Sequence, residues 1–342
     1  MSFSVGIVGL PNVGKSTLFK ALTKINVEIA PRPFTTIHPN IGIVSVPDQR
    51  LQKVAEIIKP QKVTPTVIEF IDIAGLVKGS HKGEGLGNQF LAQIRNCDAI
   101  LEVVRIFEDQ KVENVLGEIN PEKEIEIVKT ELLMKDLEGL ESSISKLEKK
   151  KDKETLKKLN LLGKIKETAS KGESISKINL TNEEKIEIRE YQFLTSKPIF
   201  YVLNTNEKNL ASLSEIKHLK INLKDEEEMS ELSQKEVQEL GLKSQLDQLI
   251  TSCYNILNLI TFFTVAGGKE VRAWTVERGA TTPEAGGVVH SDFREKFIRA
   301  EVIGWQKLVE AESWAKAREK GWLQIVGKDH PVQDGDVMEF KI

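Results

Sequence analysis

One stretch near the N-terminus has the residue types and the spacing that bind nucleotide phosphates. Residues 9–16 read GLPNVGKS and match the pattern G-x-x-x-x-G-K-[ST]. Its glycines let the backbone curl, so that successive amide N–H groups point at the phosphate oxygens. We expect Lys15 to neutralise the β- and γ-phosphates and the Ser16 hydroxyl to ligate Mg²⁺. The motif lies between a predicted strand and a predicted helix, which is the context that it requires.

Two further segments offer groups to the same phosphates and metal. An Asp-Ile-Ala-Gly sequence ends an apolar run, and the carboxyl end of such a strand is where α/β proteins bind ligands. We expect Asp72 to reach Mg²⁺ through a water and the Gly75 N–H to meet the γ-phosphate. Lys15, Asp72 and Gly75 are therefore the candidate catalytic residues. Thr36, in a proline-rich loop, is the candidate second protein ligand to Mg²⁺ beside Ser16; an ordinary loop threonine is the alternative.

The residues that would read the base differ from those of GTP-binding proteins. Guanine-specific members of this class carry N-K-x-D after a strand, and that aspartate accepts two hydrogen bonds from guanine. This chain has N-T-N-E at residues 204–207, so the lysine is missing and the acid is longer. A site built around paired hydrogen bonds loses heavily when one partner is misplaced. The pattern favours ATP: the Asn204 amide can donate to adenine N7 and accept from the N6 amine. A plain turn at the end of a strand is the alternative.

The group that positions the attacking water is not evident. Ras-type enzymes place a glutamine after the D-x-x-G glycine, whereas this chain has Leu76. Either another group positions the water, or turnover is slow until a partner completes the site. Asn12 suggests one route, because a P-loop asparagine can help coordinate K⁺ beside the phosphates; a structural role is the alternative. His81 could act as a base, but a solvated loop histidine is the simpler interpretation.

The elements that must position these residues follow an α/β pattern. Four apolar runs rich in isoleucine, valine or phenylalanine are separated by helix-like segments. This alternation predicts a doubly wound sheet of the P-loop NTPase type. The predicted strands are Phe3–Val8, Thr66–Ile73, Ala99–Ile106 and Pro198–Leu203.

A segment rich in lysine, glutamate and leucine interrupts this alternation from Pro121 to about Gly172. Its apolar residues recur at spacings of four and three, which is a heptad seam, and a second helical pattern follows a charged stretch. We predict two antiparallel helices that form a coiled-coil hairpin; a long solvated helix packed on the core is the alternative. The predicted apolar positions are Leu133, Leu137, Leu140, Ile144 and Leu147, then Leu156, Leu159, Leu162 and Ile165.

The last part of the chain has a different composition. From Leu259 onward it contains the tryptophans and β-like runs such as Glu270–Val276, and residues 332–342 carry a turn sequence typical of a hairpin. We expect a small α+β, β-grasp-like domain there. The predicted domains are a nucleotide-binding domain of residues 1–118 and 192–258, a helical coiled-coil insertion of residues 119–191, and a C-terminal domain of residues 259–342.

Composition limits the class of protein. The 342 residues are 40% hydrophobic and 29% charged, which is typical of a soluble globular protein. Lysine and arginine total 48 against 51 acidic residues, so nucleic-acid binding would need a local patch. The two distant cysteines predict buried, reduced thiols. We expect no signal peptide and no membrane span, since even the apolar run 257–268 is too short, and therefore a cytoplasmic protein.

Together the motifs resemble those of the Obg-like ATPase family, YchF type. The resemblance rests on GLPNVGKST, PFTTIHPN, DIAGLVKG, GEGLGNQF, VVRIFED and NTNE. The C-terminal KEVRAWTVERGATTPEAGGVVHSDFREKFIRAEVIGW and GKDHPVQDGDV resemble the TGS domain of that family. The resemblance covers nearly the whole chain, including the helical insertion. It implies that ATP is bound and hydrolysed in preference to GTP and that the protein associates with ribosomes.

The resemblance also implies roles for single residues. Ser16 and Thr36 would bind Mg²⁺, Asn204 and Thr205 would contact the adenine, and an aromatic residue would lie near it. The implied nucleotide-binding residues are Asn12, Val13, Gly14, Lys15, Ser16, Thr17, Phe107, Asn204 and Thr205.

Two positions depart from the family pattern. Asn222-Leu223 stands where many relatives have a small-residue turn that closes over the base. Asn114 stands where some relatives have a histidine proposed to be catalytic, which implies a lower intrinsic turnover here.

The leading interpretation is a nucleotide-dependent switch that splits ATP into ADP and phosphate with Mg²⁺, and with K⁺ as an activator. It would act as a monomer, away from membranes, on the large ribosomal subunit or the 70S ribosome, and contact rRNA or tRNA through the coiled coil and the TGS domain. The alternatives are a conventional GTPase in ribosome assembly and an ATP-binding module with negligible turnover. Interleaved glutamates leave a solvated helix face as the alternative to a phosphate-binding patch of hairpin lysines. These lysines are Lys146, Lys149, Lys150, Lys151, Lys153, Lys157, Lys158, Lys164 and Lys166.

Overall fold

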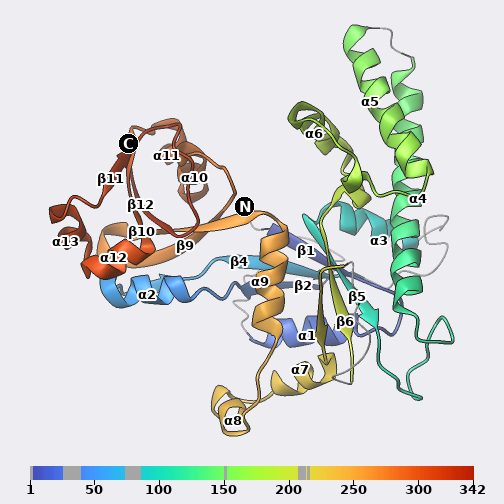
Figure 1. Cartoon of the computed structure of the whole chain (residues 1–342), viewed down its shortest axis with the longest axis horizontal. Helices are drawn as coiled ribbons and strands as arrows, with labels where there is room; N and C mark the ends of the chain where they lie inside the picture. The colour runs from blue at the N-terminus through green and yellow to red at the C-terminus, as the bar shows by residue number, and fades with distance from the viewer. Residues whose placement is uncertain (1–2, 26–39, 74–85, 150–151, 207–212, 214–215) are drawn as a thin grey trace. The chain divides into compact units, whose positions relative to one another are not determined.

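The computed structural model describes residues 3–25, 40–73, 86–149, 152–206, 213 and 216–342 (Figure 1). The described chain divides into two compact units. The larger unit consists of Phe3–Val44 and Glu69–Leu246, and the smaller unit of Ser45–Ile68 and Asp247–Ile342. Within the described ranges no helix is long and apolar enough to cross a membrane.

A six-stranded sheet in the order β2-β4-β1-β5-β6-β7 forms the centre of the larger unit. Strands β1, β5, β6 and β7 pair in parallel. All seven residues of β5 are buried, as expected of a parallel strand covered on both faces. The predicted α/β fold and its four predicted strands are confirmed. The strands are β1 Phe3–Val8, β2 Asn40–Ser45, β4 Val67–Asp72, β5 Ala99–Arg105, β6 Ile199–Asn204 and β7 His218–Ile221.

Helices cover this sheet and extend beyond it. The α-helices of the larger unit are α1 Lys15–Ile25, α3 Leu86–Arg95, α4 Pro121–Leu147, α5 Lys153–Ser170, α6 Asn182–Ile188, α7 Leu223–Met229 and α8 Gln234–Glu239. Short 3₁₀ helices are η2 Ile175–Lys177, η3 Arg189–Tyr191 and η4 Leu194–Ser196.

Helices α4 and α5 form an arm (residues 121–170) that projects from the sheet, and Figure 1 shows them side by side. Leu140, Leu162 and Ile165 share its buried apolar core, which confirms the predicted helix pair. The prediction was wrong for Leu156, whose side chain is 54% exposed. Thr155 is buried in its place. It lies on the same side of α5 as Leu162 and Ile165, at the heptad spacing of the seam.

The smaller unit contains a second six-stranded sheet, in the order β11-β10-β12-β8-β9-β3. Its strands are β3 Lys62–Thr64, β8 Leu259–Thr264, β9 Glu270–Glu277, β10 Arg299–Gly304, β11 Gln324–Val326 and β12 Asp336–Lys341. Its helices are α2 Gln49–Ile58, α9 Leu246–Ile256, η5 Ala266–Gly268, α10 Thr282–Val289, α11 Ser291–Glu295, α12 Trp305–Ala311 and α13 Trp314–Glu319.

Residues 45–68 pack with the C-terminal segment, although the sequence analysis assigned them to the nucleotide-binding domain. Leu51 and Val54 of α2 join the same apolar core as Phe263 of β8, and β3 pairs in parallel with β9. The sequence of this segment indicates an amphipathic helix and a short strand. It does not indicate the surface, remote in the sequence, that they cover.

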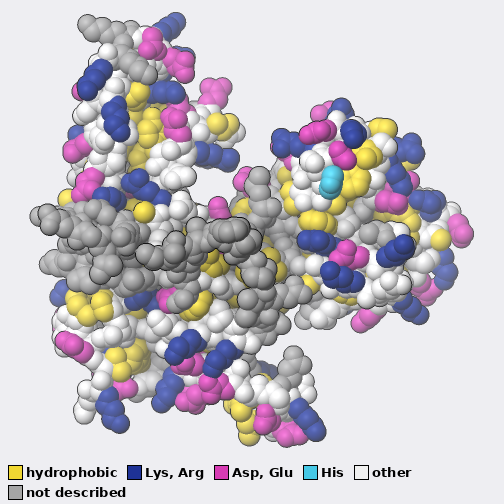
Figure 2. Space-filling model, turned by 180° about the vertical axis from the view of Figure 1, so that it is seen from behind, with side chains coloured by type: hydrophobic (Ala, Val, Ile, Leu, Met, Phe, Trp, Pro, Cys, Tyr) yellow, Lys and Arg dark blue, Asp and Glu magenta, His cyan; other side chains and the backbone are white. Residues whose placement is uncertain are grey.

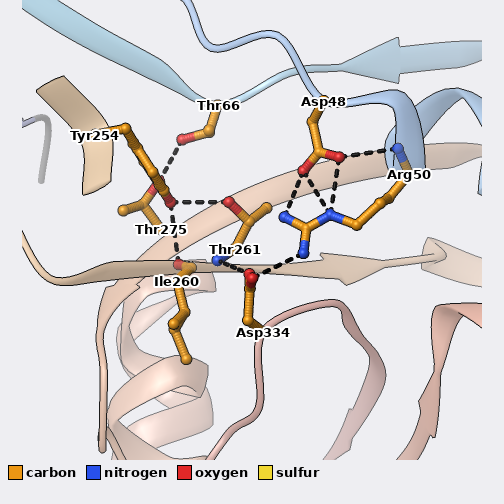
Figure 3. A network of polar contacts seen from close by, with 8 residues as sticks. All are labelled: Asp48, Arg50, Thr66, Tyr254, Ile260, Thr261, Thr275 and Asp334. Atoms are coloured by element: carbon orange, nitrogen blue, oxygen red, sulfur yellow. Dashed lines mark hydrogen bonds and ion pairs between the residues drawn. The ribbon is translucent and has the colours of Figure 1, made fainter. Parts of the chain in front are cut away.

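Two groups of polar contacts link these distant segments of the smaller unit (Figure 3). The Arg50 guanidinium lies 2.8 Å from the Asp48 carboxylate and 2.9 Å from that of Asp334. The Tyr254 hydroxyl donates to the Ile260 carbonyl oxygen at 3.1 Å and lies 2.8 Å from Thr261 Oγ1. The Arg50–Asp334 ion pair joins residues 45–68 to the segment before β12, and Thr66 Oγ1, which lies 2.5 Å from Thr275 Oγ1, joins them to β9.

The hairpin predicted within residues 332–342 is wrong. Strand β12 pairs with β10 in antiparallel and with β8 in parallel orientation. The residue before the turn, Pro331, makes an isolated bridge to Thr281 instead. Partners that are remote in the sequence therefore override the local turn signal.

Candidate nucleotide site

The P-loop has the curled backbone that phosphate binding requires. Gly9, Asn12 and Gly14 have positive φ angles of 145°, 64° and 109°. Few residues other than glycine and asparagine adopt a positive φ. A Cβ atom on Gly9 would collide with the carbonyl oxygen of Val103. Helix α1 begins at Lys15, so its N-terminal end lies at this loop, as predicted.

Lys15 is a buried cation at the end of the P-loop. Its Nζ donates to the Leu10 carbonyl oxygen at 2.8 Å. Burial lowers the pKa of Lys15 to about 8, although the carboxylates of Asp72 and Glu124 act in the opposite direction. The ammonium group therefore retains its proton at neutral pH and can neutralise a phosphate.

Ser16 and Asp72 are brought together as predicted. Strand β4 ends at Asp72, and its Oδ2 lies 3.5 Å from the Ser16 hydroxyl. Burial raises the pKa of Asp72, while Lys15 and the Ser16 hydroxyl lower it. A hydroxyl and a carboxylate are the hard oxygen donors that Mg²⁺ prefers. The predicted Gly75, Thr36, Leu76 and His81 lie outside the described residues.

A cavity of about 650 Å³ collects the phosphate-binding and base-reading candidates. All the predicted nucleotide-binding residues except Val13 line it. Val13 is buried, and its carbonyl oxygen accepts a hydrogen bond from Asn204. The cavity is lined by Asn12, Gly14, Lys15, Ser16, Thr17, Phe107, Glu108, Asp109, Val112, Asn204, Thr205, Asn206, Asn222, Lys224 and Glu227. The position and size of this cavity suit a nucleotide whose phosphates lie on the P-loop.

Asn204 connects three parts of this cavity. Its Nδ2 donates to the Val13 carbonyl oxygen at 2.9 Å, and its Oδ1 accepts from the Leu223 N–H at 3.2 Å. The next residue, Thr205, donates its N–H to the Ile221 carbonyl oxygen at 3.0 Å. Among the described residues, each polar group of the Asn204 amide has one partner, which leaves it the capacity for a second.

Comparison with known proteins decides the family. The ribosome-binding ATPase YchF of Bacillus subtilis is 44% identical over 364 residues, which cover 100% of this chain and 99% of the relative. The ribosome-binding ATPase YchF of Escherichia coli O157:H7 is 45% identical over 360 residues, with 99% of each chain covered. The chain belongs to the YchF family.

Family models and a solved structure agree with this membership. Residues 4–156 match a model described as a 50S ribosome-binding GTPase. Residues 259–342 match YchF-GTPase_C, described as a protein of unknown function. The structure of the Schizosaccharomyces pombe YchF GTPase superposes with a TM-score of 0.86 at 33% identity, and covers 99% of this chain and 98% of that one.

Two positions that depart from the YchF pattern have structural roles here. The Asn114 amide donates to the Glu118 carbonyl oxygen at 2.9 Å and accepts from the Leu116 N–H at 2.8 Å. Asn114 therefore stabilises a turn and does not line the cavity. Asn222 caps helix α7 by accepting from the Lys224 N–H at 3.2 Å, so the Leu223 N–H remains directed at Asn204.

Sequence reasoning missed several cavity residues of this YchF-family chain. Glu108 and Asp109 belong to the same VVRIFED stretch as Phe107, and Asn206 lies inside the N-T-N-E motif, so their neighbours carried a signal. Val112 lies three residues beyond that stretch and carried none. Lys224 and Glu227 lie on α7, where the sequence shows only a short charged helix.

Proposed function

We propose that this YchF-family chain is a ribosome-binding ATPase that acts as a nucleotide-dependent switch. One observation carries the proposal: a single cavity joins the P-loop and Lys15 to Asn204 and Thr205, where N-T-N-E replaces the guanine-reading N-K-x-D. The full-length relatives named ribosome-binding ATPase support both parts of the proposal.

The phosphates would bind along residues 12–17, with the Lys15 ammonium between the β- and γ-phosphates. Ser16 and Thr36 would hold Mg²⁺, with Asp72 acting through a water and the Gly75 N–H meeting the γ-phosphate. The 3.5 Å approach of the Ser16 hydroxyl to Asp72 supports this donor set. Bound Mg²⁺ supplies neutralisation of the charge that develops on the phosphate oxygens.

The adenine would lie between Phe107 and Asn204, near Thr205. Asn204 keeps one N–H and one lone pair after its contacts with Val13 and Leu223, which suits the N7 and N6 pair of adenine. The side chain of Phe107 lines the cavity and offers a ring face for stacking.

Intrinsic turnover would be slow. Leu76 follows the D-x-x-G glycine, and the Asn114 side chain is occupied in a turn, so neither can orient the attacking water. K⁺ beside Asn12 is the proposed activator, and a ribosome-bound state is the proposed setting for faster hydrolysis.

The protein would act in the cytoplasm as a monomer. It would bind the large ribosomal subunit or the 70S ribosome. The arm and the C-terminal domain are the proposed contacts to rRNA or tRNA. Figure 2 shows Lys and Arg side chains interleaved with Asp and Glu over the arm. Lys166 lies 3.0 Å from Glu141, whereas Lys146, Lys149, Lys153 and Lys157 are exposed on the arm. Binding through these lysines would weaken with salt.

Hydrolysis assays test the enzymatic part of the proposal. Phosphate release from ATP should be slow for the protein alone, and increase with K⁺ and with 70S ribosomes. Ser16→Ala, which removes the proposed metal ligand, is the matched control and should abolish the increase. No release above the Ser16→Ala level under any condition would favour the ATP-binding module with negligible turnover.

A conventional GTPase remains the second candidate, because the Schizosaccharomyces pombe structure and one family model carry that name. Restoring N-K-x-D with Thr205→Lys and Glu207→Asp separates the two functions. If the wild type reads adenine, this double variant should gain GTP affinity and lose ATP affinity. A wild type that already binds GTP as tightly as the double variant would support the GTPase.

A further inference from the structure

We propose that Arg105 is a positioning residue that holds residues 107–113, here called the pocket wall, in the shape that accepts the nucleoside part of the substrate. The inference rests on the proposed nucleotide-binding function. Arg105 is the last residue of β5, is 3% exposed and is not among the residues that line the cavity.

The guanidinium group of Arg105 is directed at backbone carbonyl oxygens of the pocket wall. Nε donates to the Phe107 oxygen at 3.2 Å, and Nη2 donates to the Asp109 oxygen at 3.3 Å. Nη1 and Nη2 both donate to the Val112 oxygen at 3.1 Å, and Nη1 also reaches the Glu113 oxygen at 3.1 Å. One side chain thus holds the carbonyl groups of four residues in an irregular segment.

Only arginine offers this set of contacts. Its planar group presents five N–H donors in a fixed fork, whereas a lysine ammonium is a point charge with three donors. The Phe107 ring adds a cation–π contact, with its centroid 4.3 Å from Arg105 Cζ. Arg105 therefore orients both the backbone of the pocket wall and the ring proposed to lie near the base.

Two further hydrogen bonds connect the pocket wall to the motifs on either side. Asn12 Nδ2 donates to the Glu113 oxygen at 3.3 Å, the same acceptor that Arg105 uses. Asn206 Nδ2 donates to the Glu108 oxygen at 3.1 Å. The cavity residues Phe107, Glu108, Asp109 and Val112 all belong to this wall. Loss of the guanidinium contacts should therefore loosen the nucleoside side of the cavity and leave the phosphate side in place.

Arg105→Lys tests the proposal in the full-length protein, with Arg50→Lys as the matched control. The control removes a comparable guanidinium fork from the smaller unit, where it contacts Asp48 and Asp334. Calorimetry should measure the affinity for ATP and for inorganic tripolyphosphate, both with Mg²⁺. Hydrogen exchange of a peptide that covers residues 107–113 should report the order of the wall without nucleotide.

The expected result for Arg105→Lys is faster exchange in residues 107–113 and an ATP affinity lower by at least about tenfold, because several hydrogen bonds are lost. The tripolyphosphate affinity should stay within about twofold, since the P-loop is retained. Arg50→Lys should change neither affinity. Asn206→Ala, an exposed substitution that removes one tie to the wall, should give a smaller loss of ATP affinity of about two- to fivefold even if Arg105→Lys folds poorly.

Three results would overturn the proposal: unchanged exchange in residues 107–113, unchanged ATP affinity, or an equal loss of tripolyphosphate affinity that marks a general destabilisation. A wild type that binds no ATP would contradict the proposed function instead. The exchange of residues 107–113 would in that case still decide whether Arg105 orders the wall.

Discussion

The side-chain amide of Asn204 donates to the carbonyl oxygen of Val13 at 2.9 Å, although 191 positions separate the two residues in the sequence. The same amide accepts from the Leu223 N–H at 3.2 Å. The residue proposed to read the base thus also fixes the P-loop. Base recognition and phosphate binding are therefore not independent in this site.

Replacement of Asn204 by alanine should weaken the binding of every phosphate ligand. ATP affinity should fall by at least about tenfold, and tripolyphosphate affinity should fall too, because the Val13 carbonyl loses its partner. Calorimetry with both ligands measures this. If tripolyphosphate binds the variant as tightly as the wild type, Asn204 reads the base without positioning the P-loop.

ATP affinity should decrease as the pH rises above the pKa of Lys15. Burial lowers that pKa to about 8 in the free protein, whereas bound phosphates favour the charged ammonium. Below this pH the group is protonated before and after binding; above it, binding must take up a proton, and affinity should fall by up to about tenfold per pH unit. Calorimetry between about pH 7 and about pH 9.5, in buffers of different ionisation enthalpy, measures both effects. Lys15→Arg, which stays charged, should bind with little pH dependence; an equally flat profile for the wild type would refute the assignment.

Glu102 should destabilise the larger unit at high pH. The side chain is 2% exposed, and its Oε1 has no hydrogen-bond partner among the residues that the structure describes. Burial, and then the nearby Glu124, raise the pKa of Glu102 well above its usual value. The unfolded chain therefore releases the Glu102 proton at a lower pH than the folded protein does. As the pH rises from the pKa of the unfolded state through the pKa of the folded state, the stability contributed by the protonated form is lost.

Glu102→Gln should therefore gain stability over the wild type as the pH increases, with a slope of at most about 1.4 kcal/mol per pH unit. Denaturation in urea at about pH 5 and about pH 8 provides the comparison. The exposed Glu126 on α4 provides a control, since Glu126→Gln should follow the wild type. Parallel pH profiles of Glu102→Gln and the wild type would contradict the predicted penalty.

Asp136 on α4 should anchor the segment that returns from the arm to the sheet. Its carboxylate accepts from the N–H groups of Leu194 and Thr195, each at 2.8 Å, and from Thr195 Oγ1 at 2.7 Å. Asp136→Ala leaves two buried N–H groups without partners and should cost about 2–5 kcal/mol of unfolding free energy. Hydrogen exchange of residues 190–197 should speed up accordingly. Glu138→Ala, an exposed change on the same helix, should be silent, and a similarly silent Asp136→Ala would exclude the anchor role.

The sequence predicted the parts of the site that depend on local backbone. Gly9, Gly14, Lys15 and Ser16 need a curled loop before a helix, and Asp72 needs only the end of a strand, so these positions could be read from the motif and its flanking runs. The fold class followed from strands and helices that alternate in the sequence.

Long-range pairing accounts for what the sequence missed. The acceptors of Arg105 are backbone carbonyls of an irregular segment, and no side-chain pattern records where they point. Strand β3 joins a sheet whose other strands all lie at or after Leu259. Strand β12 pairs with β10 and β8, and not with β11, the strand that precedes it in the sequence. Side-chain periodicity also placed Leu156 on the seam, although Thr155 takes the buried position.

The most direct test of the proposed function is the affinity of the wild-type protein for ATP and GTP, measured side by side by calorimetry with Mg²⁺. The N-T-N-E motif and the cavity around Asn204 predict that ATP binds at least about tenfold more tightly, a difference of about 1.4 kcal/mol. GTP binding that equals or exceeds ATP binding would contradict the account and place the protein with GTPases.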